Sequence, residues 1–453
     1  MHWGIVGGGP LGMTLAWEFA KSGNTVSLFE SAPEPGGLAS AWQIGDVIWD
    51  RHYHVTLASD SALRGLLAEL GLESEMQWRT ARTGFWFNDR LYPFSGALDF
   101  LRFPMLNPVE KLRFGMGIRH AAGLQSPDGI EGLTVEEWLT RLSGRSVFEK
   151  MWRPLLRAKL GDDYRTTGAT FMWATIRRMF AARRSGLRNE QFGYLTGGYA
   201  RMLERFWNSL HGAGVHLAVN ARAQEILSSP DGVRVKFADG RVEVFDRVIV
   251  TAPAPLAAGL CPQLTSGEVG TLGSVEYLGI VCVSLLLRNP LSDYYITNIS
   301  DASIPLTGVI EMSALVDRAA FQDRALVYLP RYVRPDDPVF KRSDEEITSE
   351  FAGALRRIHP SLGSQDILAG RVSRARYVFP RPVAGRTVLP PMDTSVPGVH
   401  LLNSSHIQYG TLNVNETVQL ARTHARRLHD LARTERAAPE YASGMHAFAR
   451  SGR

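Results

Sequence analysis

The first thirty residues carry an apolar pattern that predicts a strand, a glycine turn, a helix and a second strand. Residues 3–9 combine apolar residues with four glycines, and residues 11–22 have helical apolar spacing that stops at Gly23. Residues 24–30 predict a second buried strand. Such a unit of about 30 residues has the size of one βαβ element.

The next part of the chain, from about 60 to 192, has apolar spacing that predicts helices. Leu63, Leu66, Leu67 and Leu70, for example, recur at i, i+3, i+4 and i+7, which places them on one helical face. We expect no strand-rich run of any length in this region.

Beyond residue 193, short apolar runs separated by turn residues predict a β-rich region. The expected strands are 215–226, 233–237, 242–251, 278–287, 294–297, 306–310, 325–329, 372–379 and 398–403. Two helices are expected in the same part of the chain, at 344–358 and 414–433.

Composition places the chain among ordinary globular proteins, with 45% hydrophobic and 21% charged residues in 453. Cys261 and Cys282 are too few for a disulfide framework or a four-thiolate metal site, which fits a reducing compartment. The longest apolar run, 278–287, is half of the roughly 20 residues that a spanning helix needs. The first residues lack the pattern of a secretory signal. We therefore expect a cytoplasmic protein.

The net charge of +5 rests almost entirely on arginine, because only six of the 50 basic residues are Lys. This bias reflects either genome composition or a use of guanidinium forks on phosphate-bearing ligands. The net charge does not distinguish these two explanations, so local clusters of arginine are the more informative feature.

The early glycine turn matches the dinucleotide-binding pattern at Gly7, Gly9 and Gly12, followed by Glu30 at the end of the next strand. In this context the first glycine permits a tight turn, the second admits a pyrophosphate, and the third lets the helix approach the strand. The helix N-terminus adds free N–H groups for an anion. Glu30 would bind a ribose and repel a 2′-phosphate, which argues against NADP.

A second glycine pair, Gly36-Gly37, indicates a flavin dinucleotide, because its ribityl chain runs past such a loop. The stretch from Glu30 to Ser40 resembles the E-x-x-x-x-x-G-G-x-x-x-S segment of the protoporphyrinogen oxidase and flavin amine oxidase superfamily. The later segments that are similar to this superfamily, in its own order, are 48–54, 192–203 and 246–253.

The resemblance implies an α/β chain in which a Rossmann-like FAD-binding domain of the glutathione-reductase type is interleaved with an α+β substrate domain. The FAD-binding domain is expected to take residues 1–75, 190–262 and 370–435. The substrate domain is expected to take the helical 76–189 and the β-rich 263–369, and 436–453 would be a flexible tail.

The resemblance also assigns cofactor contacts. The expected FAD-binding residues are Gly7, Gly9, Pro10, Leu11, Gly12, Glu30, Ser31, Gly36, Gly37, Leu38, Ala39, Arg51, His52, Asn403, Ser404, Thr411, Leu412 and Asn413. One segment departs from the superfamily, which usually has Gly-Asp where this chain has Asn403-Ser404. Asn or Ser can still bond a ribityl hydroxyl or phosphate, and the helix opening at 411–416 can face the flavin O2.

Candidate catalytic residues are few, because a flavin itself accepts the hydride. We expect one of His52 and His54 to lie near the flavin and the other to be structural. Lys159, a rare lysine in an apolar segment, is either a solvated helix residue or a counterpart of the lysine that amine-oxidase-like enzymes often hold near N5. The spacing of the histidines does not support a metal site.

Arg177 opens a cluster of five arginines among aromatic and methionine side chains. Its other members are Arg178, Arg183, Arg184 and Arg188. The pattern fits three alternatives: a helix with a solvated basic face, a gate for an anionic and partly apolar substrate, or a helix resting on anionic lipid. The last alternative would add a peripheral contact with the inner face of a membrane. No nucleic-acid recognition motif accompanies the cluster.

Three functional hypotheses follow, and the sequence favours the first. It is an FAD-dependent oxidoreductase that dehydrogenates a C–N, C–O or C–C bond of a small, partly apolar or anionic substrate, with His54, Lys159 and Arg177 as catalytic candidates. The second is a redox-neutral flavoenzyme resembling UDP-galactopyranose mutase. Residues 90–93 of this chain resemble the segment that precedes the helical region in that family. The third is a non-catalytic FAD-binding or membrane-interaction protein.

Overall fold

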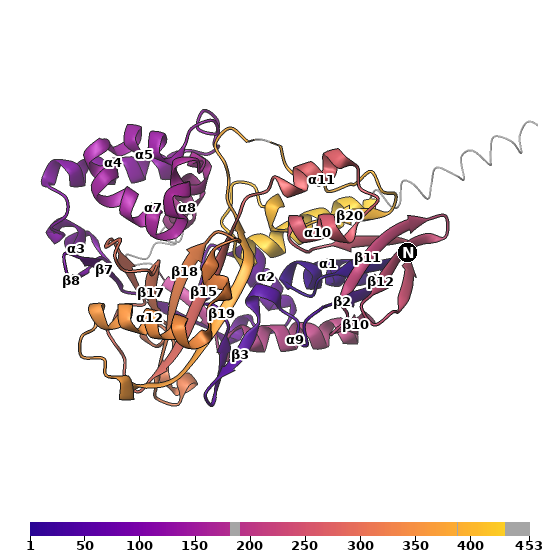
Figure 1. Cartoon of the computed structure of the whole chain (residues 1–453), viewed down its shortest axis with the longest axis horizontal. Helices are drawn as coiled ribbons and strands as arrows, with labels where there is room; N and C mark the ends of the chain where they lie inside the picture. Colours follow the sequence, from indigo (N-terminus) through magenta and orange to yellow (C-terminus); the bar gives the residue numbers. More distant parts are fainter. Residues whose placement is uncertain (182–190, 387, 431–453) are drawn as a thin grey trace, which may run out of the picture.

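The computed structural model of the chain describes residues 1–181, 191–386 and 388–430. Its elements gather in two lobes, one around a five-stranded sheet and the other around a seven-stranded sheet (Figure 1). A layer of helices from the middle of the sequence lies beside the second lobe.

The five-stranded sheet is parallel throughout. Its order is β10 (His216–Ala218), β2 (Thr25–Phe29), β1 (His2–Val6), β14 (Arg247–Val250) and β20 (Val399–Leu401). Parallel sheets are stable when both faces are covered, and the strand interiors are accordingly apolar and buried.

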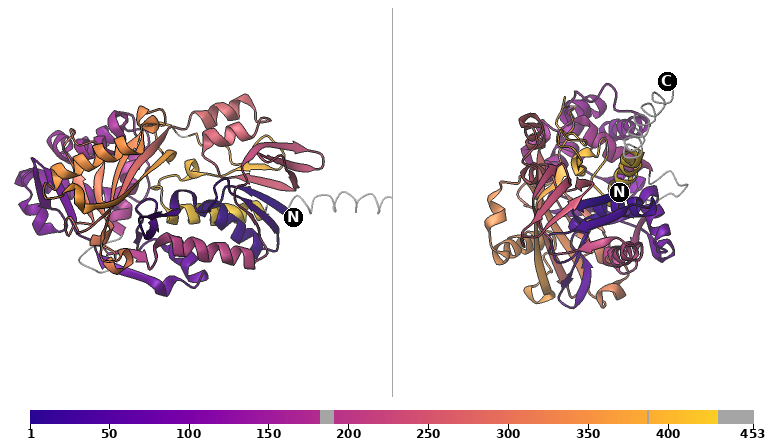
Figure 2. Two further views of the ribbon diagram at one scale, coloured as in Figure 1. Left: turned by 60° about the horizontal axis from the view of Figure 1, so that its bottom comes forward. Right: turned by 90° about the vertical axis from the view of Figure 1, so that its right-hand side faces the viewer.

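Helices cover one face of this sheet and a β-meander covers the other. Side chains of α1 (Pro10–Lys21), α9 (Gly198–Gly212) and the last helix, 414–430, share one core with Ile5 of β1. In Figure 2 (left), α9 and the last helix run along the strands of the sheet. Val6, the next residue of β1, points to the opposite core, as alternation along a strand requires.

The meander that builds this opposite core is antiparallel. It consists of β11 (Ala223–Ser229), β12 (Gly232–Phe237) and β13 (Val242–Phe245), and α10 (Ala254–Leu260) and α11 (Ser266–Gly273) follow it. The ring of Phe237 lies 4.7 Å from the ring of Phe29, so the meander packs directly on the parallel sheet.

The seven-stranded sheet contains β15 (Tyr277–Leu287), an eleven-residue strand in which every residue is buried. Its order is β19 (Ile367–Pro380), β15, β18 (Ala325–Val333), β17 (Gly308–Glu311), β16 (Ile296–Ile299), β7 (Thr83–Phe87) and β8 (Arg90–Pro93). One face packs on α12 (Asp344–Ile358) through Ile347 and Phe351. The opposite face packs on the hairpin β3 (Ala41–Ile44) and β4 (Val47–Asp50), which joins the two lobes.

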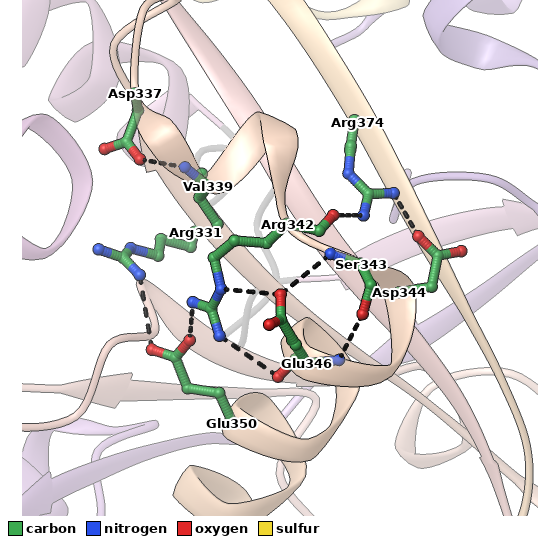
Figure 3. A network of polar contacts seen from close by, with 9 residues as sticks. All are labelled: Arg331, Asp337, Val339, Arg342, Ser343, Asp344, Glu346, Glu350 and Arg374. Atoms are coloured by element: carbon green, nitrogen blue, oxygen red, sulfur yellow. Dashed lines mark hydrogen bonds and ion pairs between the residues drawn. The ribbon is translucent and has the colours of Figure 1, made fainter.

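A polar network anchors the start of α12 (Figure 3). Ser343 and Glu346 form a reciprocal cap, in which each backbone N–H donates to the other side chain at 3.2 and 3.1 Å. Arg342 pairs with Glu350, and Arg374 of β19 pairs with Asp344. These two arginines therefore have a structural role, because they join α12 to the sheet that it covers.

The helical layer runs from residue 97 to 181. It consists of α3 (Ala97–Arg102), α4 (Pro108–Gly123), α5 (Val135–Ser143), α6 (Arg145–Val147), α7 (Arg153–Leu160) and α8 (Ala169–Ala181). Its own aromatic core includes Phe148 and Trp173 and extends to Phe379 of β19. A small sheet of β5 (Thr56–Leu57), β9 (Gln191–Leu195) and β6 (Met76–Thr80) and the helix α2 (Ser61–Glu69) complete the connection to the first lobe.

The structure corrects the expectation that 60–192 holds no strand run. Strands β6, β7 and β8 occupy much of 76–93. The β7–β8 hairpin turns through Asn88 and Asp89, whose φ angles are 49° and 53°. Two left-handed residues form the hairpin turn that matches strand twist, and Asn and Asp tolerate this conformation. The helical periodicity on either side masked this local signal.

Two expected strands are also divided. The run 242–251 breaks at Asp246 into β13 and β14, which belong to different sheets, and 215–226 breaks into β10 and β11. Apolar periodicity does not show such a break, because both halves are buried. None of the helices among residues 1–181, 191–386 and 388–430 is both long enough and apolar enough to span a bilayer.

Candidate functional site

The glycine turn after β1 has a geometry that side chains would block. Gly7 has φ +119°, in a region that disfavours side chains, and donates its N–H to Phe29 O at 2.8 Å. A Cβ on Gly12 would lie 1.9 Å from Gly7 O, whereas a Cβ on Gly9 would meet nothing within 4 Å. The turn is therefore closed on its helix side and open beside Gly9.

The first turn of α1 is free of side-chain caps. Gly9 is the N-cap residue, and Pro10 begins the helix and has no N–H to satisfy. Leu11 and Gly12 are buried behind it. Uncapped N–H groups and the helix dipole make this end suitable for an anionic group such as a phosphate.

Glu30 closes one side of the turn. One carboxylate oxygen accepts the Gly8 N–H at 2.8 Å, and the other accepts the Ala32 N–H at 2.8 Å and the Ser31 hydroxyl at 3.2 Å. The carboxylate is therefore held at the carboxyl end of β2, next to the glycine turn. This is the place that the sequence predicts for a ribose-binding acid.

The second glycine pair folds onto the first. Gly36 donates its N–H to Gly8 O at 2.8 Å and has φ +115°. A Cβ on Gly37 would lie 3.5 Å from the Gly9 Cα. The two loops, separated by β2 in the sequence, thus form one continuous backbone surface.

His52 holds this second loop in place. Its Nδ1 lies 3.3 Å from Leu38 O, and its Nε2 lies 3.1 Å from the Ser373 hydroxyl of β19. Burial lowers the pKa of His52 to about 3, so the ring is neutral and carries one N–H. Both ring nitrogens are used by the protein, and Ala39 beside the loop is buried as well.

His54 belongs to a buried cluster around Asp50. Its ring stacks on Tyr199 at 4.8 Å, and its Nδ1 lies 3.6 Å from an Asp50 carboxylate oxygen. Asp50 also accepts the Tyr199 N–H at 2.7 Å at the start of α9, and its backbone carbonyl accepts the Tyr328 hydroxyl. The spacing of residues in the sequence does not reveal this role of Asp50.

Arg51 precedes these two histidines in the chain, and its side chain lies against Trp42. Its guanidinium carbon is 5.2 Å from the indole centroid. Burial lowers the pKa of Arg51, and its Nε has no hydrogen-bond partner among the described residues. A half-buried guanidinium with an unused N–H is suited to an anionic ligand.

The segment after β20 forms a tight polar turn. The Asn403 side-chain oxygen accepts the Ser405 N–H at 3.0 Å and the Ser405 hydroxyl at 2.6 Å. Asn403 is 1% exposed, and its Nδ2 has no partner within the described part of the chain. Ser404 lies in the same turn. Buried amide groups are normally bonded, so this donor suggests a ligand.

The last helix begins beside this turn. The Asn413 side-chain oxygen accepts the Glu416 N–H at 3.0 Å, and its Nδ2 donates to Thr411 O at 2.7 Å. Asn413 is therefore the cap of the helix 414–430 rather than a free donor. Thr411 and Leu412 lie just before this helix. Leu412 lines one of two neighbouring cavities, and Thr411 lines the other.

The first of these, the aromatic cavity, lies between the helical layer, β19 and the segment after β20. Its lining includes Phe171, Phe379, Leu389, Ile407, Leu412 and Ser404. Arg381 also lines it, but its guanidinium is paired with Glu276 and donates to Thr166 and Thr167 hydroxyls at 2.9 and 3.1 Å. Its lining thus combines aromatic and aliphatic surface with polar and charged side chains, among them Glu131, Arg386 and Tyr409.

The second, the polar cavity, lies between α8 and the last helix. Its lining includes Asp60, Gln125, Arg177, Arg178, Thr411 and Glu416. Tyr409 and Gly410 line both cavities, so the two are neighbours. Burial raises the pKa of Glu416. Neither cavity can be seen in the sequence, because each assembles residues that are far apart along the chain.

The two arginines of the polar cavity differ in their partners. Arg178 pairs with Asp60 at 3.0 Å. Arg177 lies 4.9 Å from the Trp173 ring and donates to Gln125 O at 3.1 Å, with no ion pair recorded among the described residues. The remaining arginines of the sequence cluster, Arg183, Arg184 and Arg188, lie outside the described residues.

Lys159 is enclosed by aromatic rings. Its ammonium lies 5.0 Å from the Tyr332 centroid, 5.8 Å from Phe379 and 6.0 Å from Phe171. The last two rings also line the aromatic cavity. Aromatic faces attract a cation, so the side chain is directed into the protein rather than into solvent. No three His, Cys, Asp or Glu side chains gather as a metal site within the described ranges.

Comparison with known proteins identifies the family of the chain. A family profile described as "Flavin containing amine oxidoreductase" matches residues 12–429. The chain belongs to this family. It is accordingly a flavin-dependent oxidoreductase, and the resemblance in its glycine segments is confirmed.

Two relatives within reach of sequence comparison are oxidative enzymes. The 15-cis-phytoene desaturase of Narcissus pseudonarcissus is 23% identical over 398 residues, covering 83% of this chain and 68% of the relative. The coproporphyrinogen III oxidase of Staphylococcus aureus is 22% identical over 284 residues, covering 55% and 60%.

Solved structures share the fold. Putrescine oxidase bound to putrescine is 16% identical with a TM-score of 0.72, covering 95% of this chain and 99% of the other. Reduced UDP-galactopyranose mutase is 15% identical with a TM-score of 0.73, covering 95% and 96%. The Rossmann-like α/β class expected from the sequence is thus confirmed, while the exact residue ranges of the two domains stay a prediction.

A matched pair of glycine variants tests the turn. Gly12→Ala should destabilise the protein by about 3 kcal/mol, because its Cβ would collide with Gly7 O. Gly9→Ala should leave the apo-protein stable, because nothing lies within 4 Å, but should weaken flavin binding. Thermal unfolding of the apo-proteins and flavin titration measure the two effects. Equal stability losses, or unchanged flavin affinity in Gly9→Ala, would contradict this assignment.

Proposed function

We propose that the protein is an FAD-dependent oxidoreductase that dehydrogenates a C–N, C–O or C–C bond of a partly apolar substrate. The observation that carries the proposal is the joining of the two glycine loops, with Gly36 bonded to Gly8 and Glu30 at their edge. A mononucleotide would need only the first loop, whereas a dinucleotide that continues into a ribityl chain uses both.

Each part of FAD has a matching feature in the chain. The pyrophosphate would lie beside Gly9 at the N-terminus of α1, and the ribose would bind Glu30. The unpartnered donors of Arg51 and Asn403 suit the phosphate and ribityl oxygens. The capped start of the last helix, after Asn413, would face the flavin ring. The bound cofactor supplies the hydride acceptor, N5.

The substrate would lie in the aromatic cavity. Phe171, Phe379 and Leu412 offer apolar surface. Of the two arginines in the lining, Arg381 is paired with Glu276, and Arg386 donates to the Ser274 carbonyl. An anionic end of the substrate would instead reach Arg177 in the neighbouring polar cavity, because that guanidinium has no recorded ionic partner among the described residues. A partly apolar substrate also agrees with the named relatives, which act on phytoene and coproporphyrinogen III.

Lys159 would act from the edge of the aromatic cavity. Its ammonium, held by three rings, is a fixed positive charge close to the cavity wall. A positive charge at this place would stabilise negative charge that develops on the substrate–cofactor pair during reduction. Both ring nitrogens of His52 have partners in the protein, and the His54 ring stacks on Tyr199 close to Asp50. We therefore assign these histidines the role of positioning residues for the loop and for Asp50.

Removal of the Glu30 carboxylate tests the cofactor. A charge-assisted hydrogen bond to a ribose contributes about 1.5–3 kcal/mol, so Glu30→Ala should weaken FAD binding about tenfold or more. Glu34→Ala, an exposed carboxylate in the same loop, is the matched control. Fluorescence titration of apo-protein gives both affinities. Equal affinities for the two variants would place the ribose elsewhere.

Anaerobic stopped-flow spectroscopy tests the reaction type. Oxidised holoenzyme mixed with 15-cis-phytoene in detergent, coproporphyrinogen III or putrescine should lose its flavin absorbance with at least one of them, without added reductant. Lys159→Met should slow this step about tenfold or more with its FAD content unchanged, whereas Lys341→Met, an exposed lysine, should not.

The structural similarity to UDP-galactopyranose mutase raises a competing hypothesis, a redox-neutral reaction, which the same experiment tests. A redox-neutral enzyme would keep its flavin oxidised with all three compounds. It would interconvert UDP-galactopyranose only after reduction with dithionite, without net reoxidation in each cycle. The aromatic wall around Phe171 and Phe379 disfavours a bare nucleotide sugar, so we expect no such turnover.

A further inference from the structure

The helical layer exposes a group of large apolar side chains on two adjacent helices. Leu98 and Leu101 belong to α3, and Val109, Leu112 and Met116 belong to α4. Each is between 61% and 68% exposed. Single exposed apolar residues are ordinary, but five on neighbouring helices form a patch that needs an explanation.

The spacing on α4 makes this patch one continuous stripe. At 3.6 residues per turn, Val109, Leu112 and Met116 fall on the same side of the helix. Ala121 and Gly117 are buried on the other side, against the rest of the layer. The apolar stripe therefore faces solvent while a different face of α4 holds the helix in place.

Basic side chains border the stripe. By the same helical geometry, Arg113 and Arg119 lie on either side of it, and both are exposed. Arg102 ends α3 beside the patch. No ion pair is recorded for any of these three guanidinium groups among the residues that the structure describes.

The stretch 97–123 contains only two acidic residues, and neither of them neutralises this positive charge. Asp99 accepts the N–H groups of Ser95 and Gly96 at the start of α3. Glu110 is 7% exposed and pairs with Lys150 at 2.7 Å on the buried side of α4. The exposed surface thus combines apolar and positive groups without a counter-charge of its own.

We propose that this α3–α4 face docks on an anionic lipid surface. Leucine, valine and methionine side chains would enter the interfacial region, while the guanidinium groups would contact lipid phosphates. A second copy of this chain is a poorer partner, because a symmetric contact would bring the unpaired arginines of both copies together. The opposite end of the molecule carries the β11–β12 hairpin and the N-terminus (Figure 1).

The docking face also has a relation to the cavities. Ala122, near the end of α4, and Gln125, just beyond it, line the polar cavity. A lipid surface against α4 would therefore lie on the same helix that forms one wall of that cavity. The proposal concerns the surface alone and holds whichever substrate the enzyme oxidises.

Vesicle co-sedimentation of the full-length holo-protein tests the proposal. The protein should sediment with vesicles of phosphatidylcholine and phosphatidylglycerol and much less with pure phosphatidylcholine, and 0.5 M salt should weaken the binding. Arg113→Gln/Arg119→Gln should lower the partition coefficient about thirtyfold, and Leu112→Gln/Met116→Gln should lower it at least about tenfold.

Two variants distant from α3 and α4 serve as controls. Val242→Gln/Val244→Gln removes exposed apolar side chains of β13, and Arg222→Gln removes an exposed guanidinium. Both should bind vesicles as the parent protein does. All variants change exposed positions, so unchanged thermal unfolding and flavin content should accompany every result.

The outcomes that overturn the proposal are distinct. Absence of binding to the anionic vesicles, or equal binding by the α4 variants and the controls, would refute it. A dimer that Leu112→Gln/Met116→Gln dissociates in sedimentation velocity, with no vesicle binding by the parent protein, would instead assign the face to a second copy. Flavin reduction by a substrate does not enter any of these readouts, so failure here is separate from failure of the proposed reaction.

Discussion

The close approach of two glycine loops is the constraint on which the rest of the site depends. Gly36 donates to Gly8 O at 2.8 Å, and a Cβ on Gly12 would lie 1.9 Å from Gly7 O. A side chain at Gly12 would push α1 away from β1, and one at Gly36 would collide with Leu203 and with the Ser40 backbone. Because the loops meet, Glu30 and the first turn of α1 share one open surface, which suits a dinucleotide.

The segment 50–54 connects this surface to the second lobe. Asp50 accepts the N–H at the start of α9, and its carbonyl accepts the Tyr328 hydroxyl of β18. His52 joins the second glycine loop to Ser373 of β19. Polar groups buried between lobes are costly unless bonded, so these contacts fix how the lobes meet. The aromatic cavity lies at another part of this junction, between the helical layer, β19 and the segment after β20.

Local geometry explains what the sequence predicts well. Gly7 bonds to Phe29, Gly36 bonds to Gly8, and Gly12 packs on Gly7, so these contacts are local and their spacing carries much of the information. The β7–β8 hairpin was missed because its signal, Asn88-Asp89, is only two residues long between helical patterns. The cavities and the capping role of Asn413 depend on elements far apart in the chain, which periodicity does not bring together.

We propose that the joined loops hold one FAD molecule in each chain without a covalent bond. Acid denaturation of the purified, FAD-saturated protein, followed by chromatography of the supernatant and quantitation of flavin against protein, tests it most directly. We predict that one FAD is released for each chain and that the precipitate is colourless. FMN in place of FAD, flavin retained by the precipitate, or no flavin after saturation would contradict it.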